Sequence, residues 1–383
     1  MRIGVNTRLL IKGKIDGIAW FSHEILKRMV AAHPEHEFVF FFDRPCPQEF
    51  IFAPNVRPVI VRPPARHPFL WFLFFEIGMR RALKREKIDV FFSPDGWLCL
   101  GSKVKTLLVI HDLNFVHYPQ FSPFWSRWYY RIFFPRFARK AVKIGTVSQF
   151  SKNDIAQCYN IDLDKICVAY NGVAENFHEI SESRKTTVRE KITQGIPYFV
   201  FVGTASKRKN VARILLAFEA FCQAGHRAKL VFAGRKKYWD GEMNAVYQNM
   251  QFQNDVVFTG YLSAKDMNEV LSSALALLYP SVFEGFGIPI IEAFTCGVPV
   301  ITSDTSSMPE VGGDAVMLVN PFSVEEITTA MQTVFQDENL HKELIFKGKK
   351  QLQLFSWDKS AKDLWKEIEN LSDCDCYDLY DTV

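Results

Sequence analysis

Residues 198–225 read YFVFVGTASKRKNVARILLAFEAFCQAG and contain three elements in succession. The run YFVFV is short, apolar and rich in aromatic and β-branched residues, which predicts a buried strand. A polar loop follows, and then a helix is predicted over 211–223, with Asn210 as its N-cap and Gly225 just past its end. A strand, a loop and an amphipathic helix in this order form the repeating unit of a parallel, doubly wound sheet.

The same alternation extends from this segment in both directions. The further predicted strands are AKLVFAG, DVVFTG, LALLYP and PVITS after it, and RIGV, EFVFFF, VRPVIV, DVFFS, TLLVIH, KIGTVS and KICVAY before it. We therefore predict an α/β protein with two doubly wound, Rossmann-like domains, at residues 1–180 and 198–355. We expect residues 181–197 to form a linker region with a short helix, residues 356–371 a terminal helix that packs back towards the N-terminal domain, and residues 372–383 an acidic tail.

Length and composition are those of a globular protein. A chain of 383 residues that is 48% apolar can bury a large core. The N-terminus, MRIGVNTRLL, lacks the apolar segment of a signal peptide, and the apolar run PFLWFLFFEIGM at 68–79 is shorter than the ~20 residues that span a bilayer. We therefore expect a cytoplasmic protein without a transmembrane helix. The eight cysteines form no C-x-x-C pair and are expected to be reduced, buried thiols, and no metal site is expected at Cys374 and Cys376.

Charge is distributed unevenly between the two halves. Residues 1–190 carry 28 Lys and Arg against 18 Asp and Glu, a balance of +10, and the remainder carries 18 against 24, a balance of −6. Much of the basic excess lies among aromatic residues in FWSRWYYRIFFPRFARKA, residues 124–141. Two interpretations remain open. The segment is either a helix with a core-facing aromatic side and long basic side chains over apolar surface, or a peripheral contact with an anionic membrane.

The loop that follows the strand YFVFV is a candidate anion site. Arg208 and Lys209 directly precede the predicted N-cap of the helix at 211–223. The first amides of a helix and the helix dipole favour an anion at that end, and two cations beside it could neutralise a diphosphate. The alternative is an ordinary solvated turn.

A second candidate site lies in SVFEGFGIPIIEAF, residues 281–294. Gly285 and Gly287 allow the backbone to approach a ligand closely, and Pro289 suits the first turn of a helix. Glu284 and Glu292 have no recognised metal-ligand spacing, so carboxylates that bind neutral hydroxyl groups are the alternative to acid–base catalysts. A ligand with a central diphosphate and hydroxyls at both ends would use all these groups, as a nucleotide sugar does.

A family resemblance supports this interpretation. The E-x7-E pair formed by Glu284 and Glu292, with GFGIP between them and CGVPVITSDTSSMPEVGGDAVMLVNP after them, resembles the retaining family 4 glycosyltransferases of the GT-B fold. So do FVGTASKRKN, LVFAGRKK, VVFTGYL, LVIHDLNFVHYP, TVSQFSKNDI and VAYNGV, in order along nearly the whole chain. The resemblance implies two Rossmann-like domains that face each other across a cleft, the N-terminal one on the acceptor side and the C-terminal one binding the nucleotide sugar.

The resemblance also implies roles for individual residues. Glu284 is expected to hold hydroxyls of the donor sugar and Glu292 those of the ribose, while Lys209, aided by Arg208, neutralises the diphosphate. His111 matches the family histidine that faces the reacting sugar. The remaining residues expected at the donor are Gly17, Gly203, Thr204, Gly234, Tyr261, Phe286, Gly287 and Ile288, the last three through backbone amides.

Three departures from the family pattern stand out. In the loop GTASKRKN, Thr204 occupies the position after the first glycine, where many relatives have arginine. Arg208 is expected to supply the missing positive charge. The first-domain loop reads GIAW, with Ala19 and Trp20, where Gly-Ile-Gly-Arg is common. The segment GRKK at 234–237 would border the base, but it does not distinguish guanine from uracil.

Taken together, the resemblance implies an enzyme that transfers a hexose, with mannose slightly favoured, from a GDP or UDP sugar to a saccharide or lipid-linked acceptor with retention, in surface polysaccharide or glycan synthesis. It implies front-side attack without metal or cofactor, and no nucleic-acid partner is expected. The alternatives are a glycoside hydrolase, a non-catalytic protein that binds nucleotide sugars or a partner, and a nicotinamide-dependent dehydrogenase. The dehydrogenase is disfavoured because no G-x-G-x-x-G follows the first strand.

Overall fold

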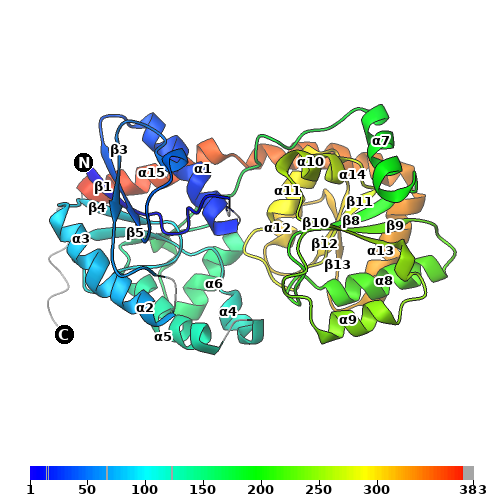
Figure 1. The fold of residues 1–383 in the computed structure, drawn as a ribbon, viewed down its shortest axis with the longest axis horizontal. Helices are drawn as coiled ribbons and strands as arrows, with labels where there is room; N and C mark the ends of the chain where they lie inside the picture. The colour runs from blue at the N-terminus through cyan, green and yellow to red at the C-terminus, as the bar shows by residue number, and fades with distance from the viewer. Residues whose placement is uncertain (14, 16, 66–67, 122–123, 374–383) are drawn as a thin grey trace. The chain divides into compact units, whose positions relative to one another are not determined.

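The computed structural model describes residues 1–13, 15, 17–65, 68–121 and 124–373 of the chain. These residues form two compact units. The first runs from Met1 to Asn171 and is completed by the residues from Ser356 onwards, and the second runs from Gly172 to Phe355. Each unit is a twisted sheet with helices packed around it (Figure 1).

Among its described residues, the first unit contains a seven-stranded parallel sheet in the order β3-β2-β1-β4-β5-β6-β7. The order reverses between β1 and β4, and the carboxyl ends of strands at such a reversal are where ligands bind in doubly wound sheets. The strands are β1 (Arg2–Asn6), β2 (Glu37–Phe42), β3 (Val56–Ile60), β4 (Val90–Ser93), β5 (Lys105–Val109), β6 (Lys143–Thr146) and β7 (Ile166–Val168).

The helices of the first unit include one from the far end of the chain. They are α1 (Gly17–Ala32), α2 (Pro68–Leu73), a π-helix (Phe74–Met79), α3 (Arg80–Arg85), α4 (Asn114–His117), α5 (Phe124–Lys140), α6 (Gln149–Tyr159) and α15 (Trp357–Asp373). Helix α15 packs against α1 and β5. Arg28 of α1 donates to Asp358 at 2.7 Å, and Ser360 donates to the carbonyl oxygen of Tyr170 at 2.5 Å. The last helix therefore completes the first unit.

The second unit, which is described without gaps, has a six-stranded parallel sheet in the order β10-β9-β8-β11-β12-β13. Its order reverses between β8 and β11. The strands are β8 (Tyr198–Val202), β9 (Lys229–Ala233), β10 (Val256–Gly260), β11 (Ala276–Tyr279), β12 (Val300–Ser303) and β13 (Val316–Val319). The helices are α7 (Glu182–Thr193), α8 (Val211–Gln223), α9 (Gly241–Gln248), α10 (Ala264–Ser272), α11 (Ile288–Thr295), α12 (Met308–Gly312), α13 (Val324–Gln336) and α14 (Glu338–Gln351).

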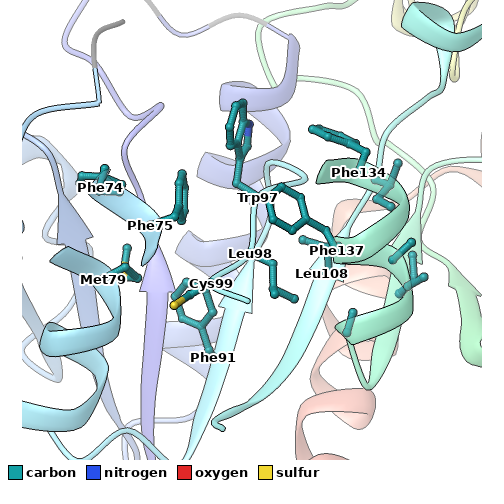
Figure 2. Close-up of a cluster of buried hydrophobic side chains, with 14 of the residues drawn as sticks. Phe74, Phe75, Met79, Phe91, Trp97, Leu98, Cys99, Leu108, Phe134 and Phe137 are labelled. Carbon is teal, nitrogen blue, oxygen red and sulfur yellow. The ribbon is translucent and has the colours of Figure 1, made fainter. Parts of the chain in front are cut away.

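The core of the first unit contains many aromatic side chains among aliphatic ones (Figure 2). Phe74, Phe75 and Met79 of the π-helix, Trp97 of the loop after β4, and Phe134 and Phe137 of α5 belong to one buried cluster. The core interpretation of the basic aromatic segment is therefore correct for part of α5. It does not account for Trp125 and Trp128, whose exposed fractions are 69% and 58%.

The division into units differs from the predicted domains at one boundary. Residues 181–197 were expected to be a linker region with a short helix. The helix is present as α7, but it lies within the second unit, which begins at Gly172. Arg184 of α7 forms an ion pair with Glu269 of α10 at 2.7 Å, and Arg189 donates to the carbonyl oxygen of Ser273 at 2.8 Å. Polar composition suggested a linker, whereas here polar side chains attach a helix to its own unit. Residues 374–383 of the predicted tail lie outside the described residues.

Cysteine burial partly contradicts the sequence-based expectation. All cysteines in the described part of the chain are free thiols, as expected, and Cys99, Cys222 and Cys296 are buried. Cys46 and Cys167, however, are half-buried, and Cys158 on α6 is exposed. No helix among the described residues has both the length and the apolar character needed to cross a membrane.

Candidate active site

The candidate site lies where the strand order of the second sheet reverses. Strand β8 ends at Val202 and the adjacent strand β11 ends at Tyr279 (Figure 1). The chain leaves β8 towards β9 on one side and leaves β11 towards β12 on the other, so the loops at 203–210 and 280–287 diverge from the same edge. These loops carry the predicted cations and the first of the predicted glutamates.

The two loops are joined by direct contacts. Arg208 forms an ion pair with Glu284 and also donates to the carbonyl oxygen of Phe283 at 2.8 Å. The backbone amide of Val282 donates to the carbonyl oxygen of Arg208, again at 2.8 Å. The structure therefore brings together a cation and a carboxylate that lie 76 positions apart in the sequence.

Asn210 strengthens this junction in a way that differs from the prediction. It occupies the N-cap position of α8, as expected, but its side chain forms no capping hydrogen bond. Instead, its amide group donates to the carbonyl oxygens of Pro280 and Pro321 at 3.0 and 2.5 Å. The buried amide is used to tie the β8 loop to its neighbours rather than to satisfy the helix end.

Lys209 joins the same network through Tyr279, a residue outside the predicted site. Its Nζ atom donates to the hydroxyl oxygen of Tyr279 at 3.1 Å, and that hydroxyl donates to Glu284 at 2.9 Å. Tyr279 is only 2% exposed. Arg208, Glu284, Tyr279 and Lys209 thus form one continuous polar chain. The signal that could have revealed Tyr279 is its place as a polar residue at the carboxyl end of the apolar run LALLYP.

Electrostatics distinguish the two glutamates. Burial raises the pKa of Glu284, but the positive charges of Arg208 and Lys209 outweigh it, and the net result is a lowered pKa. At Glu292, on the first turns of α11, burial dominates over the attraction of Lys209 and raises the pKa to about 7. Glu284 is therefore ionised at neutral pH, whereas Glu292 is about half protonated. Burial also lowers the pKa of Lys209, and Glu284 counteracts this effect.

Two of the predicted glycines permit close packing of backbone beside Lys209. A Cβ atom on Gly234 would lie 2.0 Å from the carbonyl oxygen of Gly203, and one on Gly203 would lie 2.8 Å from Nζ of Lys209. Both residues have positive φ angles, +120° at Gly203 and +152° at Gly234. A larger residue at Gly234 would force the loops after β8 and β9 apart, whereas one at Gly203 would displace the end of the Lys209 side chain. Thr204 follows Gly203 in this loop and is half-buried.

The helix α11 begins in the second predicted loop. Gly287 takes the N-cap position with a φ of +98°, and Ile288 is the first residue of the helix. The ring of Phe286 is buried and packs edge-on against that of Phe355, with the ring centroids 5.4 Å apart. The loop can therefore offer its backbone to a ligand but not this side chain. The amides of a first helical turn have no acceptor within the helix, which suits an anion.

Two serines hold Glu284 in place from the other side. Ser306 accepts a hydrogen bond from the amide of Glu284 at 3.2 Å, and Ser307 donates to its carbonyl oxygen at 2.9 Å. Both lie in the quoted motif SDTSSMPE but were not predicted as site residues. They fix the backbone of Glu284 and so position its carboxylate.

Tyr261 lies beyond the end of the adjacent strand β10. It is 71% exposed, and the guanidinium group of Arg235 is placed 4.5 Å from its ring centroid. Arg235 belongs to the GRKK segment that directly follows β9. The predicted donor-side residues Gly234 and Tyr261 thus belong to neighbouring strand ends, and the guanidinium group of Arg235 lies over the Tyr261 ring.

The remaining predicted residues belong to the first unit. His111 follows β5, and its Nε2 atom lies 2.8 Å from the carbonyl oxygen of Pro94 in the loop after β4. Burial lowers the pKa of His111, so its ring is neutral at neutral pH. Gly17 begins α1 with a φ of +47°.

A buried polar group that the sequence did not reveal lies at the reversal of the first sheet. Asp95, after β4, lies 2.9 Å from the guanidinium Nε of Arg8 and accepts from Asn6 at 2.6 Å, both residues lying at or just after the end of β1. This ion pair holds the ends of β1 and β4 together. Its residues come from segments that carry no recognisable motif.

Comparison with known proteins identifies the family of both halves of the chain. Residues 15–177 match the family model "Glycosyltransferase Family 4", and residues 183–351 match "Glycosyl transferases group 1". The second match contains Glu292 and the whole polar chain of Arg208, Glu284, Tyr279 and Lys209.

Curated relatives cover most of the chain. It is 27% identical over 362 residues to O-antigen chain mannosyltransferase B of Escherichia coli. This match covers 91% of this chain and 94% of that protein. It is 25% identical over 290 residues to O-antigen chain mannosyltransferase RfbU of Salmonella typhimurium, covering 74% of this chain and 76% of that protein.

Solved structures share the fold of two Rossmann-like domains, GT-B. Sucrose-phosphate synthase from Thermosynechococcus elongatus superposes with a TM-score of 0.78 at 16% identity, covering 97% of this chain and 98% of that one. WaaG, a glycosyltransferase involved in lipopolysaccharide biosynthesis, gives 0.74 at 16% identity, with coverage of 96% and 99%. HepE of Anabaena, solved with UDP-glucose, also gives 0.74 at 16% identity, with coverage of 97% and 100%. The chain therefore belongs to the glycosyltransferases of the family 4 type, with a group 1 glycosyltransferase domain in its C-terminal half.

Proposed function

We propose that the chain transfers a hexose, in the first instance mannose, from a nucleoside-diphosphate sugar to a saccharide or lipid-linked acceptor in the synthesis of a surface polysaccharide such as O-antigen. The observation that carries this proposal is the polar chain Arg208–Glu284–Tyr279–Lys209 at the reversal of the second sheet. Cleavage of the bond between the sugar and the diphosphate leaves negative charge on the phosphates. Cations already fixed at that position stabilise the charge without further reorganisation.

The choice of mannose and of O-antigen rests on the named relatives, two of which are O-antigen chain mannosyltransferases. The use of a nucleotide sugar is supported by the fold neighbour HepE, which was solved with UDP-glucose. We propose GDP-mannose as the first donor to test and UDP-hexoses as the second.

We further propose transfer with retention, by front-side attack and without a metal or cofactor. In this scheme the leaving phosphate accepts the proton of the acceptor hydroxyl. Glu284 is ionised and bound to Arg208 and Tyr279, which suits an acceptor of sugar hydroxyl hydrogens rather than a proton donor. Glu292 would hold the ribose hydroxyls from the first turns of α11.

A series of ligands tests the proposal by thermal unfolding. A ligand present at 100 times its Kd stabilises the folded state by about 2.7 kcal/mol, which raises the unfolding temperature by several degrees. We expect such a rise with GDP-mannose or a UDP-hexose, a smaller one with the matching nucleoside diphosphate, and none with free mannose. Release of mannose from nitrophenyl mannosides without any nucleotide response would instead support a glycoside hydrolase. A response to a donor without release of nucleoside diphosphate would support a non-catalytic protein that binds nucleotide sugars, and no response to any donor would support a partner-binding protein.

We also propose that the exposed part of α5 contacts an anionic membrane that carries the acceptor. Trp125, Trp128 and Arg131 are exposed and spaced by three residues, so they share one side of the helix. Phe72 of α2 is also exposed, and its ring lies 6.1 Å from that of Phe133 on α5. Exposed tryptophans beside arginines are typical of surfaces that sit at a lipid interface.

Sedimentation with lipid vesicles tests this contact. We expect the protein to pellet with anionic vesicles at low salt and much less at high salt, because exposed charges are screened within about 8 Å at physiological ionic strength. Trp128→Ala should reduce the pelleted fraction, whereas Phe346→Ala, which removes a similarly exposed aromatic side chain from the second unit, should not. If both variants lost the same pelleted fraction, or if the wild type did not pellet at low salt, the membrane contact would be contradicted. The basic side chains would then be ordinary solvated groups.

A further inference from the structure

A cluster of three different ligand-type side chains lies at the ends of α4 and α6 in the first unit. His117 is the last residue of α4, and Asp154 and Cys158 lie one turn apart on α6. The His117 Nε2 atom lies 2.7 Å from an Asp154 carboxylate oxygen, and the Cys158 sulfur lies 3.4 Å from the same oxygen and 3.9 Å from Nε2. This is the one group of three or more His, Cys, Asp and Glu side chains within the described residues that converge closely enough to hold a metal ion.

Asp154 is the least satisfied member of the cluster. The residue is 9% exposed, and its second carboxylate oxygen is buried without a hydrogen-bond partner. Within the described part of the chain, no lysine or arginine forms an ion pair with Asp154, and the basic side chain in contact with it is His117 at 2.7 Å. A buried carboxylate with an unused oxygen costs free energy unless a cation or a donor compensates it.

The ligand types select the class of ion. One imidazole nitrogen, one carboxylate oxygen and one thiolate form a set that Mg²⁺ and Ca²⁺ avoid, because those ions prefer oxygen ligands throughout. Zn²⁺ binds all three types and accepts three protein ligands with a water molecule at the fourth position. We propose that His117, Asp154 and Cys158 form a zinc site.

The distances need little change to accept the ion. In a tetrahedral zinc site, ligand atoms lie about 3.3–3.6 Å from one another. The sulfur already meets this geometry towards Asp154 at 3.4 Å and nearly meets it towards His117 at 3.9 Å. Only the short contact of 2.7 Å between His117 and Asp154 must open, which exchanges a hydrogen bond for two bonds to the metal. The 37% exposure of the His117 side chain provides a route from solvent.

Zinc at this site would attach the loop that carries His111 to α6. The segment 110–117 leads from the end of β5 through His111 to α4. Ser151 on α6 donates to the carbonyl oxygen of His111 at 3.2 Å, so α6 already supports this loop at one point. A metal bond between His117 and α6 would add a second, stronger attachment. The expected role is therefore to fix this loop, with water at the fourth position of the ion, and it does not depend on the proposed transferase reaction.

Titration of the chelator-treated, full-length chain with ZnCl2 tests the site. We expect one zinc per chain by calorimetry and a higher unfolding temperature when zinc is bound, because the ion binds the folded state. Cys158→Ser and His117→Ala should each lower the affinity about tenfold or more, since even changes to groups behind the ligands cost that much. With CoCl2 in place of zinc, the wild type should show a thiolate-to-cobalt absorption band that Cys158→Ser lacks.

Cys46→Ser is the matched control. Cys46 is a half-buried thiol of the same unit whose sulfur contacts the carbonyl oxygen of Pro47, so its removal should leave zinc affinity and the cobalt band unchanged. The proposal is overturned if the wild type binds no zinc after chelator treatment. It is equally overturned if Cys158→Ser, shown to be folded by circular dichroism, binds zinc as tightly as the wild type does.

Discussion

Replacement of Lys209 by alanine is expected to lower turnover by about two orders of magnitude or more, which is the usual cost of removing an electrostatic group that acts on developing charge. Lys209 is held by the hydroxyl of Tyr279 at 3.1 Å and lies within reach of the charges of Glu284 and Glu292. Burial disfavours the charged form of Lys209, because its ammonium group is poorly solvated. A bound diphosphate would therefore interact strongly with this charge. Turnover can be measured without a known acceptor, as release of nucleoside diphosphate from the donor that stabilises the protein most.

Lys207 provides the control for this experiment. It lies in the same loop, is exposed, and pairs with Asp240 and Glu242, each at 3.2 Å. Lys207→Ala removes the same charge two positions away and should leave turnover within about threefold of the wild type. If Lys209→Ala also retained turnover within threefold, or if both variants lost it equally, the diphosphate would not be neutralised by Lys209.

The strands were predictable because parallel sheets buried on both faces produce short, continuous apolar runs. EFVFFF and YFVFV are such runs and form β2 and β8. Every strand named from the sequence is present. The missed strand is β13 (Val316–Val319), which has only four residues, lies at the sheet edge and is partly exposed. Neither its length nor its edge position explains the omission, because β7 has only three residues, also lies at a sheet edge and was predicted.

The site could be predicted only as far as its motifs reach. The loops bearing Lys209 and Glu284 follow strands, and the carboxyl ends of parallel strands share one edge, so their proximity was expected. The contacts between side chains were not. The pairing of Arg208 with Glu284, and the role of Tyr279 between Glu284 and Lys209, depend on strand order and on side-chain direction across β8 and β11. Strand order and side-chain direction cannot be read from the sequence. The pairing changes the expected chemistry, because Arg208 is already bound to Glu284 before any ligand binds.

The two glutamates should separate when binding of the bare nucleoside diphosphate is measured. Glu292 is expected to hold the ribose, which the bare nucleotide contains, and Glu284 the sugar, which it lacks. Loss of a hydrogen bond to a charged group costs about 1.5–3 kcal/mol, so Glu292→Ala should weaken binding roughly ten- to hundredfold in calorimetry. Glu284→Ala should leave the affinity near that of the wild type or increase it, because removal of the carboxylate releases Arg208 towards the phosphates. In that variant the loss should appear in turnover.

The pH dependence adds an independent check of the same assignment. Burial raises the pKa of Glu292 to about 7, so its carboxylate is largely protonated below that pH and ionised above it. The ionised form offers both oxygens as acceptors to the two ribose hydroxyls, and its hydrogen bonds are stronger than those of the protonated form. The affinity of the wild type divided by that of Glu292→Ala should therefore rise as the pH increases through about 7, and the titration of the nucleotide itself cancels in this ratio. A flat ratio would place the ribose elsewhere. If bare nucleotide binding were lost on removal of Glu284 instead, the sugar and ribose ends of the donor would be the reverse of those proposed.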